Sequence, residues 1–332
     1  MKTVNIGIIG LGYVGQIHLR HCLKLDNTEV SAAADLSKKA LSQAKSAGVT
    51  RTYTDYEQLL QDSQIDAVII GLPTHLHLQC AKKAAEAKKH IFLEKPIARN
   101  TNEAKEILSS TKKNSVKLMI GYPLRFNTTF VNLKKEMENG KIGDVEIAHA
   151  AYISTGPFMH RADAHTPIPV PEWWFNKDLT GGGALVDLGS HIINLLRWYF
   201  GEITDIKSLL GYRFNLDLED SATCIAKFER RTRALINVGW FSQGYQLKVD
   251  LYGSVKTASA QHTPSNPILT AAQMLTTGIS KFYWPHYAEL QHFVNCIINE
   301  SPPSPSGEEG LKDLEAITRA YENRIFPDST IR

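Results

Sequence analysis

Cysteine is scarce in this sequence: the 332 residues include only Cys22, Cys80, Cys224 and Cys296, and no two of them form a C-x-x-C pair. Such isolated cysteines argue against a zinc ribbon and a disulfide framework, and they are typical of a reducing compartment. Long apolar runs are absent as well, since no uncharged stretch reaches the roughly 20 residues that a membrane span requires. The apolar N-terminus has no signal-peptide cleavage pattern. We therefore expect a cytoplasmic protein without a membrane partner.

Concentrated charge of one sign is also missing. The formal net charge is +3, and lysine pairs such as Lys82-Lys83 are scattered among alanine, glutamate and leucine at helical spacing. Solvated helix faces explain these pairs, and no basic stripe indicates nucleic acid binding. With 43% hydrophobic and 21% charged residues the composition is that of a globular protein, and 332 residues are enough for two domains.

Short apolar runs alternate with helical stretches over residues 1–122. The runs lie at 4–9, 30–34, 67–70, 91–93 and 118–121, and helical spacing occurs at 13–25, 37–47, 74–88 and 101–113. Apolar strands separated by helices indicate a parallel sheet covered on both faces. We predict an α/β domain with a doubly wound parallel sheet over residues 1–122.

Residues 123–332 have a different pattern. Stretches typical of strands lie at 145–154, 203–214, 221–229, 232–241 and 245–253. Their turn-length connections predict antiparallel pairing, and hence a second domain of α+β type. Ser306 with Glu309 three residues later forms a capping box, which predicts a C-terminal helix.

A G-x-G-x-x-G motif follows the first apolar run. Gly10 permits a tight turn, Gly12 allows close approach to a pyrophosphate, and Gly15 allows the helix to pack on the strand. The backbone amides that open the helix, near Tyr13 and Val14, would face the phosphates. A glycine turn without a ligand is the alternative.

Asp35 ends the next apolar run, 20 residues beyond Gly15. A carboxylate there accepts hydrogen bonds from a ribose diol and repels a 2′-phosphate, which favours NAD over NADP. Lys38 and Lys39 leave NADP open, since a nearby cation tolerates the phosphate.

Two further sites combine charged residues with apolar segments. Glu94 and Lys95 follow the run at 91–93, at the strand edge where open α/β sheets bind ligands. A solvated loop lysine is the alternative.

Asp187 and His191 are four residues apart in an apolar stretch of helical period, so they share one face. Histidine suits proton transfer from an alcohol, and a carboxylate can orient its ring. A buried Asp–His pair with a purely structural role is the alternative.

Together with 71–77 and 121–126, these motifs resemble the glucose–fructose oxidoreductase / inositol dehydrogenase / rhizopine catabolism (Gfo/Idh/MocA) family over nearly the whole chain. The resemblance implies a Rossmann domain, followed by an α+β domain whose large, mostly antiparallel sheet often forms dimers or tetramers. It also implies an NAD(P)-dependent enzyme that oxidises or reduces one secondary hydroxyl group of a sugar, sugar nucleotide or cyclitol.

The resemblance also assigns roles to residues. Lys95 would contact substrate and nicotinamide ribose, His191 would be the general base, and Asp187 its partner near the substrate. Further contacts are implied for Leu72, Thr74, His77, Glu94 and Arg125 with the cofactor and for Tyr122 with the substrate. No metal is expected, because His75 and His77 have no third histidine or acid close in sequence.

A proline-rich segment at 156–175 ends in Trp173 and Trp174. Indole rings can stack on sugars, although they can equally anchor the loop to the core. Arg161, His165 and Tyr283 are further candidates for contact with a polyhydroxyl ligand. The long loop favours a sugar or sugar nucleotide over free myo-inositol. The alternatives are a cyclitol dehydrogenase, a dihydrodiol or tetrapyrrole reductase, and a non-catalytic NAD-binding sensor.

Overall fold

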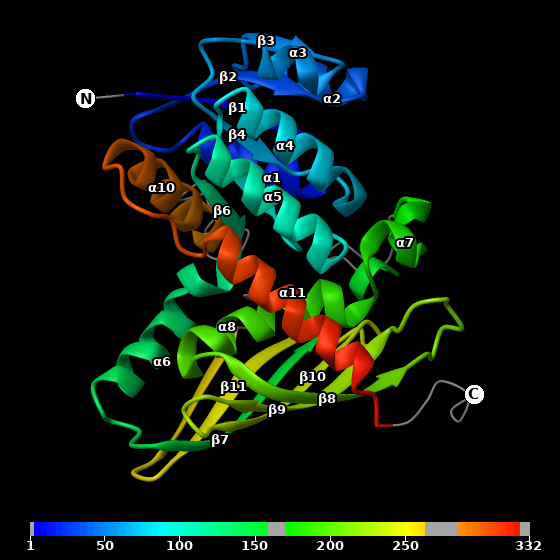
Figure 1. Cartoon of the computed structure of the whole chain (residues 1–332), viewed down its shortest axis with the longest axis vertical. Helices are drawn as coiled ribbons and strands as arrows, with labels where there is room; N and C mark the ends of the chain where they lie inside the picture. The colour runs from blue at the N-terminus through cyan, green and yellow to red at the C-terminus, as the bar shows by residue number, and fades with distance from the viewer. Residues whose placement is uncertain (1–2, 159–169, 263–283, 326–332) are drawn as a thin grey trace. The chain divides into compact units, whose positions relative to one another are not determined.

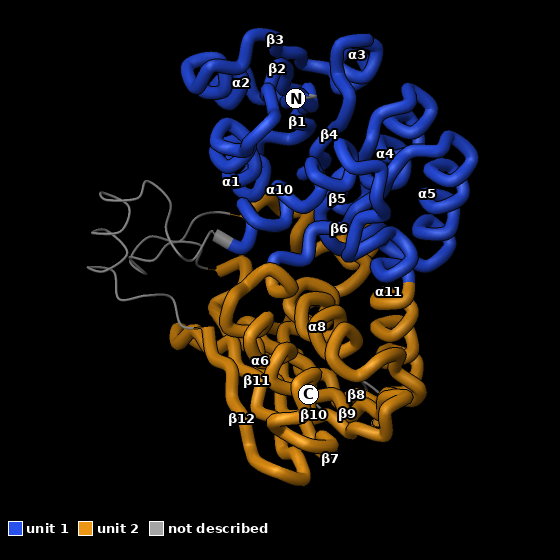
Figure 2. Tube along the Cα trace, turned by 90° about the vertical axis from the view of Figure 1, so that its left-hand side faces the viewer, with its two compact units in different colours: residues 1–123, 283–311 blue, residues 124–282, 312–332 orange. Residues whose placement is uncertain are grey.

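The computed structural model describes residues 3–158, 170–262 and 284–325. The chain divides into two compact units, which Figure 2 colours separately. Unit 1 comprises residues 1–123 and 283–311, and unit 2 comprises residues 124–282 and 312–332. Residues 283–311 thus group with the N-terminal residues, although their sequence pattern placed them in the C-terminal domain. The reason is that α10 (Trp284–Ile298) packs against α1 (Tyr13–Cys22).

Unit 1 is built on a six-stranded parallel sheet with the order β3-β2-β1-β4-β5-β6. Its strands are β1 (Val4–Ile9), β2 (Thr28–Ala34), β3 (Arg51–Tyr53), β4 (Ala67–Ile70), β5 (His90–Glu94) and β6 (Leu118–Gly121). The connecting helices are α1, α2 (Lys38–Ser46), α3 (Tyr56–Leu60), α4 (His77–Glu86) and α5 (Thr101–Lys113) (Figure 1). The predicted doubly wound sheet is confirmed. Its strand order reverses between β1 and β4, which is where such sheets bind ligands.

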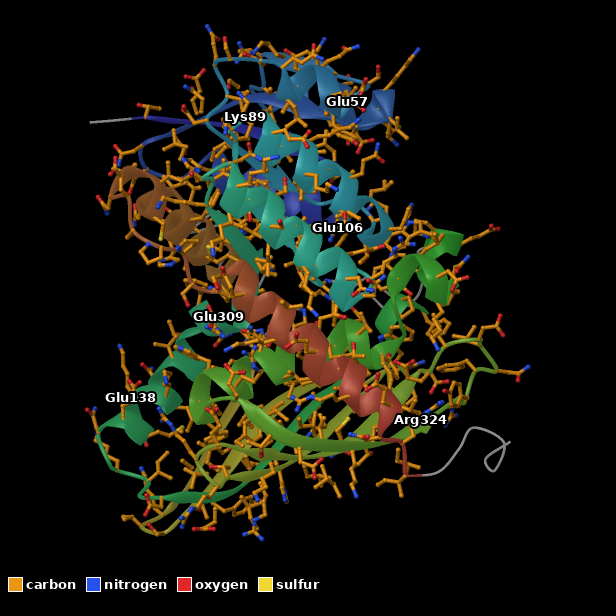
Figure 3. All side chains as sticks on the ribbon, viewed as in Figure 1. Glu57, Lys89, Glu106, Glu138, Glu309 and Arg324 are labelled. Carbon is orange, nitrogen blue, oxygen red and sulfur yellow. The ribbon has the colours of Figure 1, made fainter. Side chains whose placement is uncertain are left out.

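The lysine pairs at 38–39, 82–83 and 112–113 lie on helices, as their spacing predicted. The prediction was wrong for Lys88-Lys89, which follows α4: Lys89 is buried, and its Nζ donates to Asp62 O and Ile65 O, each at 2.8 Å. Lys82 on α4 pairs with Glu106 on α5 at 2.9 Å, and Lys83 pairs with Glu57 on α3. Figure 3 labels both glutamates on their helices. Ion pairs of this exposed kind contribute little stability.

Unit 2 contains a six-stranded sheet with the order β12-β11-β7-β10-β9-β8. The strands are β7 (Val145–Ile153), β8 (Ile203–Gly211), β9 (Ser221–Phe228), β10 (Arg233–Gly239), β11 (Gln246–Gly253) and β12 (Thr257–His262). Neighbours pair antiparallel except β7 and β10, which are parallel. The predicted mostly antiparallel sheet is confirmed.

Helices cover one face of this sheet: α6 (Thr128–Glu138), α8 (Ser190–Phe200) and the later part of α11 (Gly307–Glu322) (Figure 1). Their apolar side chains share one core with alternate strand residues such as Ile236 and Val249. The opposite face exposes Ile147, Ile225 and Tyr252. A four-residue helix, α7 (Lys177–Thr180), precedes the glycines at 181–183.

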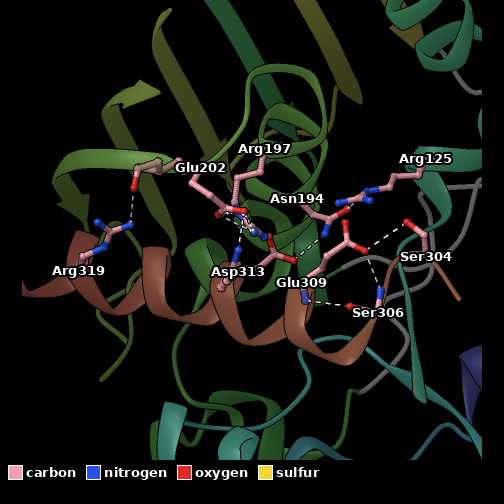
Figure 4. Close-up of polar contacts among 11 residues, drawn as sticks. Arg125, Asn194, Arg197, Glu202, Ser304, Ser306, Glu309, Asp313 and Arg319 are labelled. Atoms are coloured by element: carbon pink, nitrogen blue, oxygen red, sulfur yellow. Dashed lines mark hydrogen bonds and ion pairs between the residues drawn. The ribbon is translucent and has the colours of Figure 1, made fainter. Parts of the chain in front are cut away.

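The capping box before α11 forms as predicted. The Ser306 N–H donates to the Glu309 carboxylate at 2.8 Å, and the Glu309 N–H donates to Ser306 Oγ at 3.3 Å (Figure 4). Two orphan amides of the first turn are satisfied in this way.

Candidate active site

The glycine motif makes the turn from β1 to α1. Gly10 has φ = +87°, a conformation that side chains rarely adopt, and a Cβ on Gly15 would lie 1.9 Å from the Gly10 carbonyl oxygen. Gly12 is different, because a Cβ there would meet no atom within 4 Å. The fold itself therefore requires Gly10 and Gly15, whereas Gly12 borders open space.

That open space lies at the N-terminus of α1. Gly12 is the N-cap residue and supplies no side-chain hydrogen bond to the first turn, and the following Tyr13 is 58% exposed. The amides of Tyr13 and Val14 belong to that first turn. A helix N-terminus without a side-chain cap favours an anion, so this cradle fits the diphosphate of a dinucleotide.

Asp35 lies directly after β2, beside the same turn. Its Oδ2 accepts the Leu11 N–H and its Oδ1 accepts the Ser37 N–H, each at 2.6 Å. Asp35 thus braces the glycine turn, a role that the spacing argument did not include. Carboxylate oxygens have further lone pairs, so the half-buried Asp35 can still accept ribose hydroxyl groups.

The segment after β4 lies against the glycine turn. The Gly71 N–H donates to Ile9 O at 2.8 Å, Leu72 is half-buried and Thr74 is 7% exposed. His77 is buried, with Nδ1 at 2.9 Å from Pro96 O and Nε2 at 2.9 Å from Leu72 O. Burial lowers the pKa of His77, and the single N–H of a neutral ring can donate to one of these two carbonyl oxygens. This contact assigns His77 a supporting role at the predicted cofactor site.

Lys95 is the exception in a buried segment. Every other residue from 91 to 98 is buried, whereas Lys95 is partly accessible. The preceding Glu94 accepts a hydrogen bond from His18 Nε2 at 2.6 Å. Burial disfavours the charge of Glu94, but the hydrogen bond and charge of His18 outweigh burial, so the pKa of Glu94 lies below its usual value. Sequence reasoning missed His18, which is 76 residues away along the chain.

His21, on α1 as well, supports a prediction about acid stability. Burial, followed by the nearby His286 and His18, lowers the pKa of His21 to about 3. Below about pH 6.5 the unfolded chain therefore binds a proton that the native ring does not, and stability falls as the pH falls towards about 3. We expect His21→Gln to remove about 2 kcal/mol of the loss in unfolding free energy between about pH 7 and pH 5. Urea unfolding at both pH values measures this loss; an equal loss in variant and wild type would contradict the assignment.

Asp187 and His191 are the corresponding exceptions in unit 2. From residue 182 to residue 197 all other positions are buried, and only these two are partly accessible. Asp187 belongs to a π-helical turn (Leu185–Gly189) and His191 to the start of α8. π-helical turns occur frequently at functional sites. An otherwise buried stretch is thus accessible at Asp187 and His191, the two residues that the sequence singled out.

The end of the sheet in unit 2 holds this pair. Trp240, directly after β10, donates its Nε1–H to Asp187 Oδ2 at 3.2 Å. The ring of Tyr152, near the end of β7, lies 6.0 Å from the His191 ring between centroids. Strand ends therefore position both side chains.

Glu219 supports the start of the same helix, and no local motif marks it. Its buried Oε1 accepts the N–H groups of Gly183 and Leu185, each at 3.0 Å, and the Tyr321 hydroxyl at 2.6 Å. Burial raises the pKa of Glu219. A Cβ on Gly183 would lie 1.9 Å from Glu219 O, so the third glycine of 181–183 is a packing requirement.

Arg125 lies in unit 2, within a 3-10 turn (Pro123–Phe126) that begins at the end of unit 1. Its Nε donates to Asn194 Oδ1 at 2.7 Å, and its guanidinium lies over the Trp198 ring. Asn194 in turn donates to Asp313 at 2.6 Å, and Arg197 also pairs with Asp313 (Figure 4). Burial raises the pKa of Asp313 to about 6. Packing on α8 thus orients Arg125, whose contact with a cofactor remains a prediction.

The candidate substrate residues differ in how exposed their side chains are. Trp173 and Trp174 lie in a 3-10 turn (Glu172–Phe175), half-buried, with ring centroids 5.6 Å apart. Tyr122, by contrast, is only 2% exposed, which leaves its ring little surface for a substrate. Arg161, His165 and Tyr283 lie outside the described residues, as does most of the proline-rich loop.

Two family models match the chain. Residues 4–122 match the oxidoreductase family with an NAD-binding Rossmann fold, and residues 130–259 match the GFO/IDH/MocA C-terminal domain.

Among the residues that the structure describes, no helix combines the length and apolar character that crossing a membrane would require.

Individual proteins are similar over almost the full length. An uncharacterised oxidoreductase of Bacillus subtilis is 28% identical, covering 98% of this chain and 95% of that protein. Myo-inositol 2-dehydrogenase of Thermotoga maritima is 26% identical over 94% of this chain and 93% of its own. The structure of scyllo-inositol dehydrogenase from Lactobacillus casei with NAD(H) and scyllo-inositol superposes with a TM-score of 0.81, at 25% identity and 97% coverage of both chains.

Proposed function

Because the chain belongs to the Gfo/Idh/MocA oxidoreductase family, we propose that it transfers a hydride between NAD and a secondary hydroxyl group of a cyclitol or pyranose sugar. The observation that carries this proposal is shared by both units. Lys95 in one and the Asp187–His191 pair in the other are the only accessible residues of otherwise buried segments. Ionisable side chains that remain accessible within buried segments are candidates for a functional site.

The dinucleotide would be held by the glycine turn, with Asp35 at its ribose. The open space at Gly12 and the uncapped N-terminus of α1 support a diphosphate there. The negative charge of Asp35 next to that turn supports NAD over NADP. When bound, the nicotinamide supplies the acceptor for the hydride.

In the oxidation, the substrate O–H bond breaks as the His191 ring accepts the proton. Asp187 stabilises the protonated ring through its charge. The C–H electron pair leaves with the hydride, and a C=O bond forms. Lys95, a cation, stabilises the negative charge that develops on the oxygen. The proton and the hydride therefore leave to different acceptors, and the reverse sequence describes reduction.

A polyhydroxylated six-membered ring is the substrate class that we favour. The similar proteins with named substrates include inositol dehydrogenases and a levoglucosan dehydrogenase. The tryptophan pair supports stacking on such a ring. We further propose that the protein is cytoplasmic and self-associates through the sheet face with Ile225, which is 56% exposed.

Gly12 and Gly15 give a matched test of the cofactor site. We expect Gly12→Ala to weaken NAD binding by about tenfold or more while the melting temperature stays within about 2 °C, because its Cβ fills the space meant for the diphosphate. Gly15→Ala should instead destabilise the fold, since its Cβ would lie 1.9 Å from Gly10 O. Calorimetric titration with NAD and with NADP, combined with thermal melts, measures both. Wild-type NAD affinity in Gly12→Ala would contradict the assignment.

A substrate panel tests the proposed reaction. Wild-type protein is mixed with NAD and, separately, with myo-inositol, scyllo-inositol, levoglucosan, aldopyranoses and nucleotide sugars, and NADH absorbance is followed. We expect at least one cyclitol or pyranose to produce NADH. Tight NAD binding without turnover of any member would instead support a non-catalytic sensor.

A further inference from the structure

We propose that His18 is a positioning residue for Lys95: it holds the Glu94 carboxylate, and that carboxylate holds the Lys95 backbone. His18 is fully buried on α1, and its Nε2–H donates to Glu94 Oε1 at 2.6 Å. Glu94 Oε2 accepts the Lys95 N–H at 3.2 Å. The inference rests on the proposed role of Lys95 in the reaction.

This pair of hydrogen bonds links two parts of the proposed site. The glycine turn opens α1, and His18 follows Gly15 by three residues on that helix. The same rigid helix, α1, therefore holds the dinucleotide at its N-terminus and positions the lysine after β5. The distance between them is then set by the helix and by one carboxylate rather than by a loop alone.

The surroundings of His18 restrict its ring to one orientation. Phe92 packs edge-on at 5.2 Å and His286 at 5.8 Å between ring centroids. Nε2 faces Glu94, and Nδ1 is buried without a hydrogen-bond partner among the described residues. The bond to Glu94 and the ring packing therefore dictate the orientation of His18.

A second acid next to this pair leaves the negative charge on Glu94. Glu289 is buried on α10, and its Oε1 lies 3.0 Å from His286 Nδ1. Burial and the charge of Glu94 raise the pKa of Glu289 well above its usual value. The negative charge is therefore favoured on Glu94, which accepts a hydrogen bond on each of its two oxygens.

The same side chains raise the question of a metal. Possible ligand atoms of His18, His286 and Glu289 lie within 4.8 Å of one another. Tetrahedral zinc, with bonds of about 2.0–2.1 Å, places its ligand atoms about 3.3 Å apart. The 4.8 Å range of these distances and the short His18–Glu94 hydrogen bond favour the hydrogen-bonded arrangement over a metal site. A metal bound to the purified protein would contradict it.

The test compares His18→Leu, which removes the donor, with His18→Gln, whose side-chain amide can still donate to Glu94. We expect His18→Leu to lower kcat by about tenfold or more, as the loss of a hydrogen bond to a charged group predicts, while KM for NAD changes less than about twofold. His18→Gln should recover most of kcat. His21→Leu, an imidazole removed from the same helix, serves as the control and should keep wild-type kcat. Equal loss in His18→Leu and His18→Gln, or in His21→Leu, would overturn the proposal.

Two further measurements separate this inference from the proposed function. Hydrogen exchange of the Lys95 amide should be faster in His18→Leu than in wild type and His18→Gln, whether or not Lys95 is catalytic; unchanged exchange overturns the proposal. In a Lys95→Met background, His18→Leu should lower kcat no further, whereas an additive loss indicates a general structural lesion. If Lys95→Met alone retains wild-type kcat, the proposed role of Lys95 in the transition state fails, and exchange alone decides whether His18 holds the turn. Stoichiometric zinc in wild-type protein that disappears in His18→Gln would also overturn the proposal.

Discussion

Replacing His191 with asparagine should lower kcat by about 10²- to 10⁴-fold, the usual contribution of a general base. Asparagine keeps a polar side chain at this position but cannot accept the hydroxyl proton. His191 is one of two accessible residues in a stretch that is otherwise buried, so the substitution removes little packing. Steady-state kinetics with the substrate found in the panel measures kcat, and titration with NAD measures cofactor affinity, which should change less than about twofold.

His149 provides a matched control for that experiment. His149 is exposed on β7 and does not belong to the buried core. His149→Asn should therefore retain wild-type kcat. If His191→Asn turns over at the wild-type rate, or if both variants lose activity equally, His191 is not the base.

Replacing Lys95 with methionine should lower kcat by about 10²- to 10³-fold, as removal of one preorganised stabiliser of a developing oxyanion typically does. Methionine preserves most of the side-chain volume and removes only the charge. The surrounding buried segment should keep its fold, because Lys95 is the partly accessible position in it. The free energy of unfolding should therefore change by less than about 0.5 kcal/mol, the range of ordinary surface substitutions.

Lys88→Met controls for loss of a lysine charge in unit 1. Lys88 is exposed and donates to Asn114 Oδ1 at 2.9 Å, so it takes part in surface structure only. We expect wild-type kcat from this variant. A Lys95→Met enzyme with unchanged kcat and a raised KM would reassign Lys95 from stabilising the transition state to binding the substrate.

Local sequence signals predicted the elements that position the site. The glycine motif marked the turn between β1 and α1 because Gly10 and Gly15 have no substitute there: one has a positive φ, and a Cβ on the other would overlap a carbonyl group. The capping box marked the start of α11 because its two hydrogen bonds are local. The four-residue spacing of Asp187 and His191 predicted one accessible face, and these two positions are accessible.

Local sequence signals did not predict which residues far apart in the sequence would become hydrogen-bond partners. Glu94 is held by His18, 76 residues away, and the start of the π-helical turn is supported by Glu219, which lies 36 residues from Gly183. Nothing in the neighbourhood of a residue in sequence indicates which distant polar group it will meet. The same limit applies to α10, whose place on α1 depends on the tertiary fold. β3 was missed for a different reason: its three residues are half-buried and form no apolar run.

Burial also changed the interpretation of residues that family resemblance singled out. His77 lies between two backbone carbonyl groups inside the protein and can donate to one of them, and Tyr122 is almost fully buried. Their positions are therefore explained by packing and hydrogen bonding in unit 1. Asp35 acquires a second role, since it accepts the Leu11 amide of the glycine turn and the Ser37 amide that precedes α2.

The most direct test of the central claim follows the hydride itself. The best substrate of the panel is prepared with deuterium at its carbinol carbon and incubated with NAD and the protein, and the NADH is analysed by mass spectrometry. Direct transfer predicts that the NADH carries the deuterium and that His191→Asn and Lys95→Met slow its appearance. NADH without deuterium, or no NADH from any cyclitol or sugar, would contradict a hydride-transferring dehydrogenase.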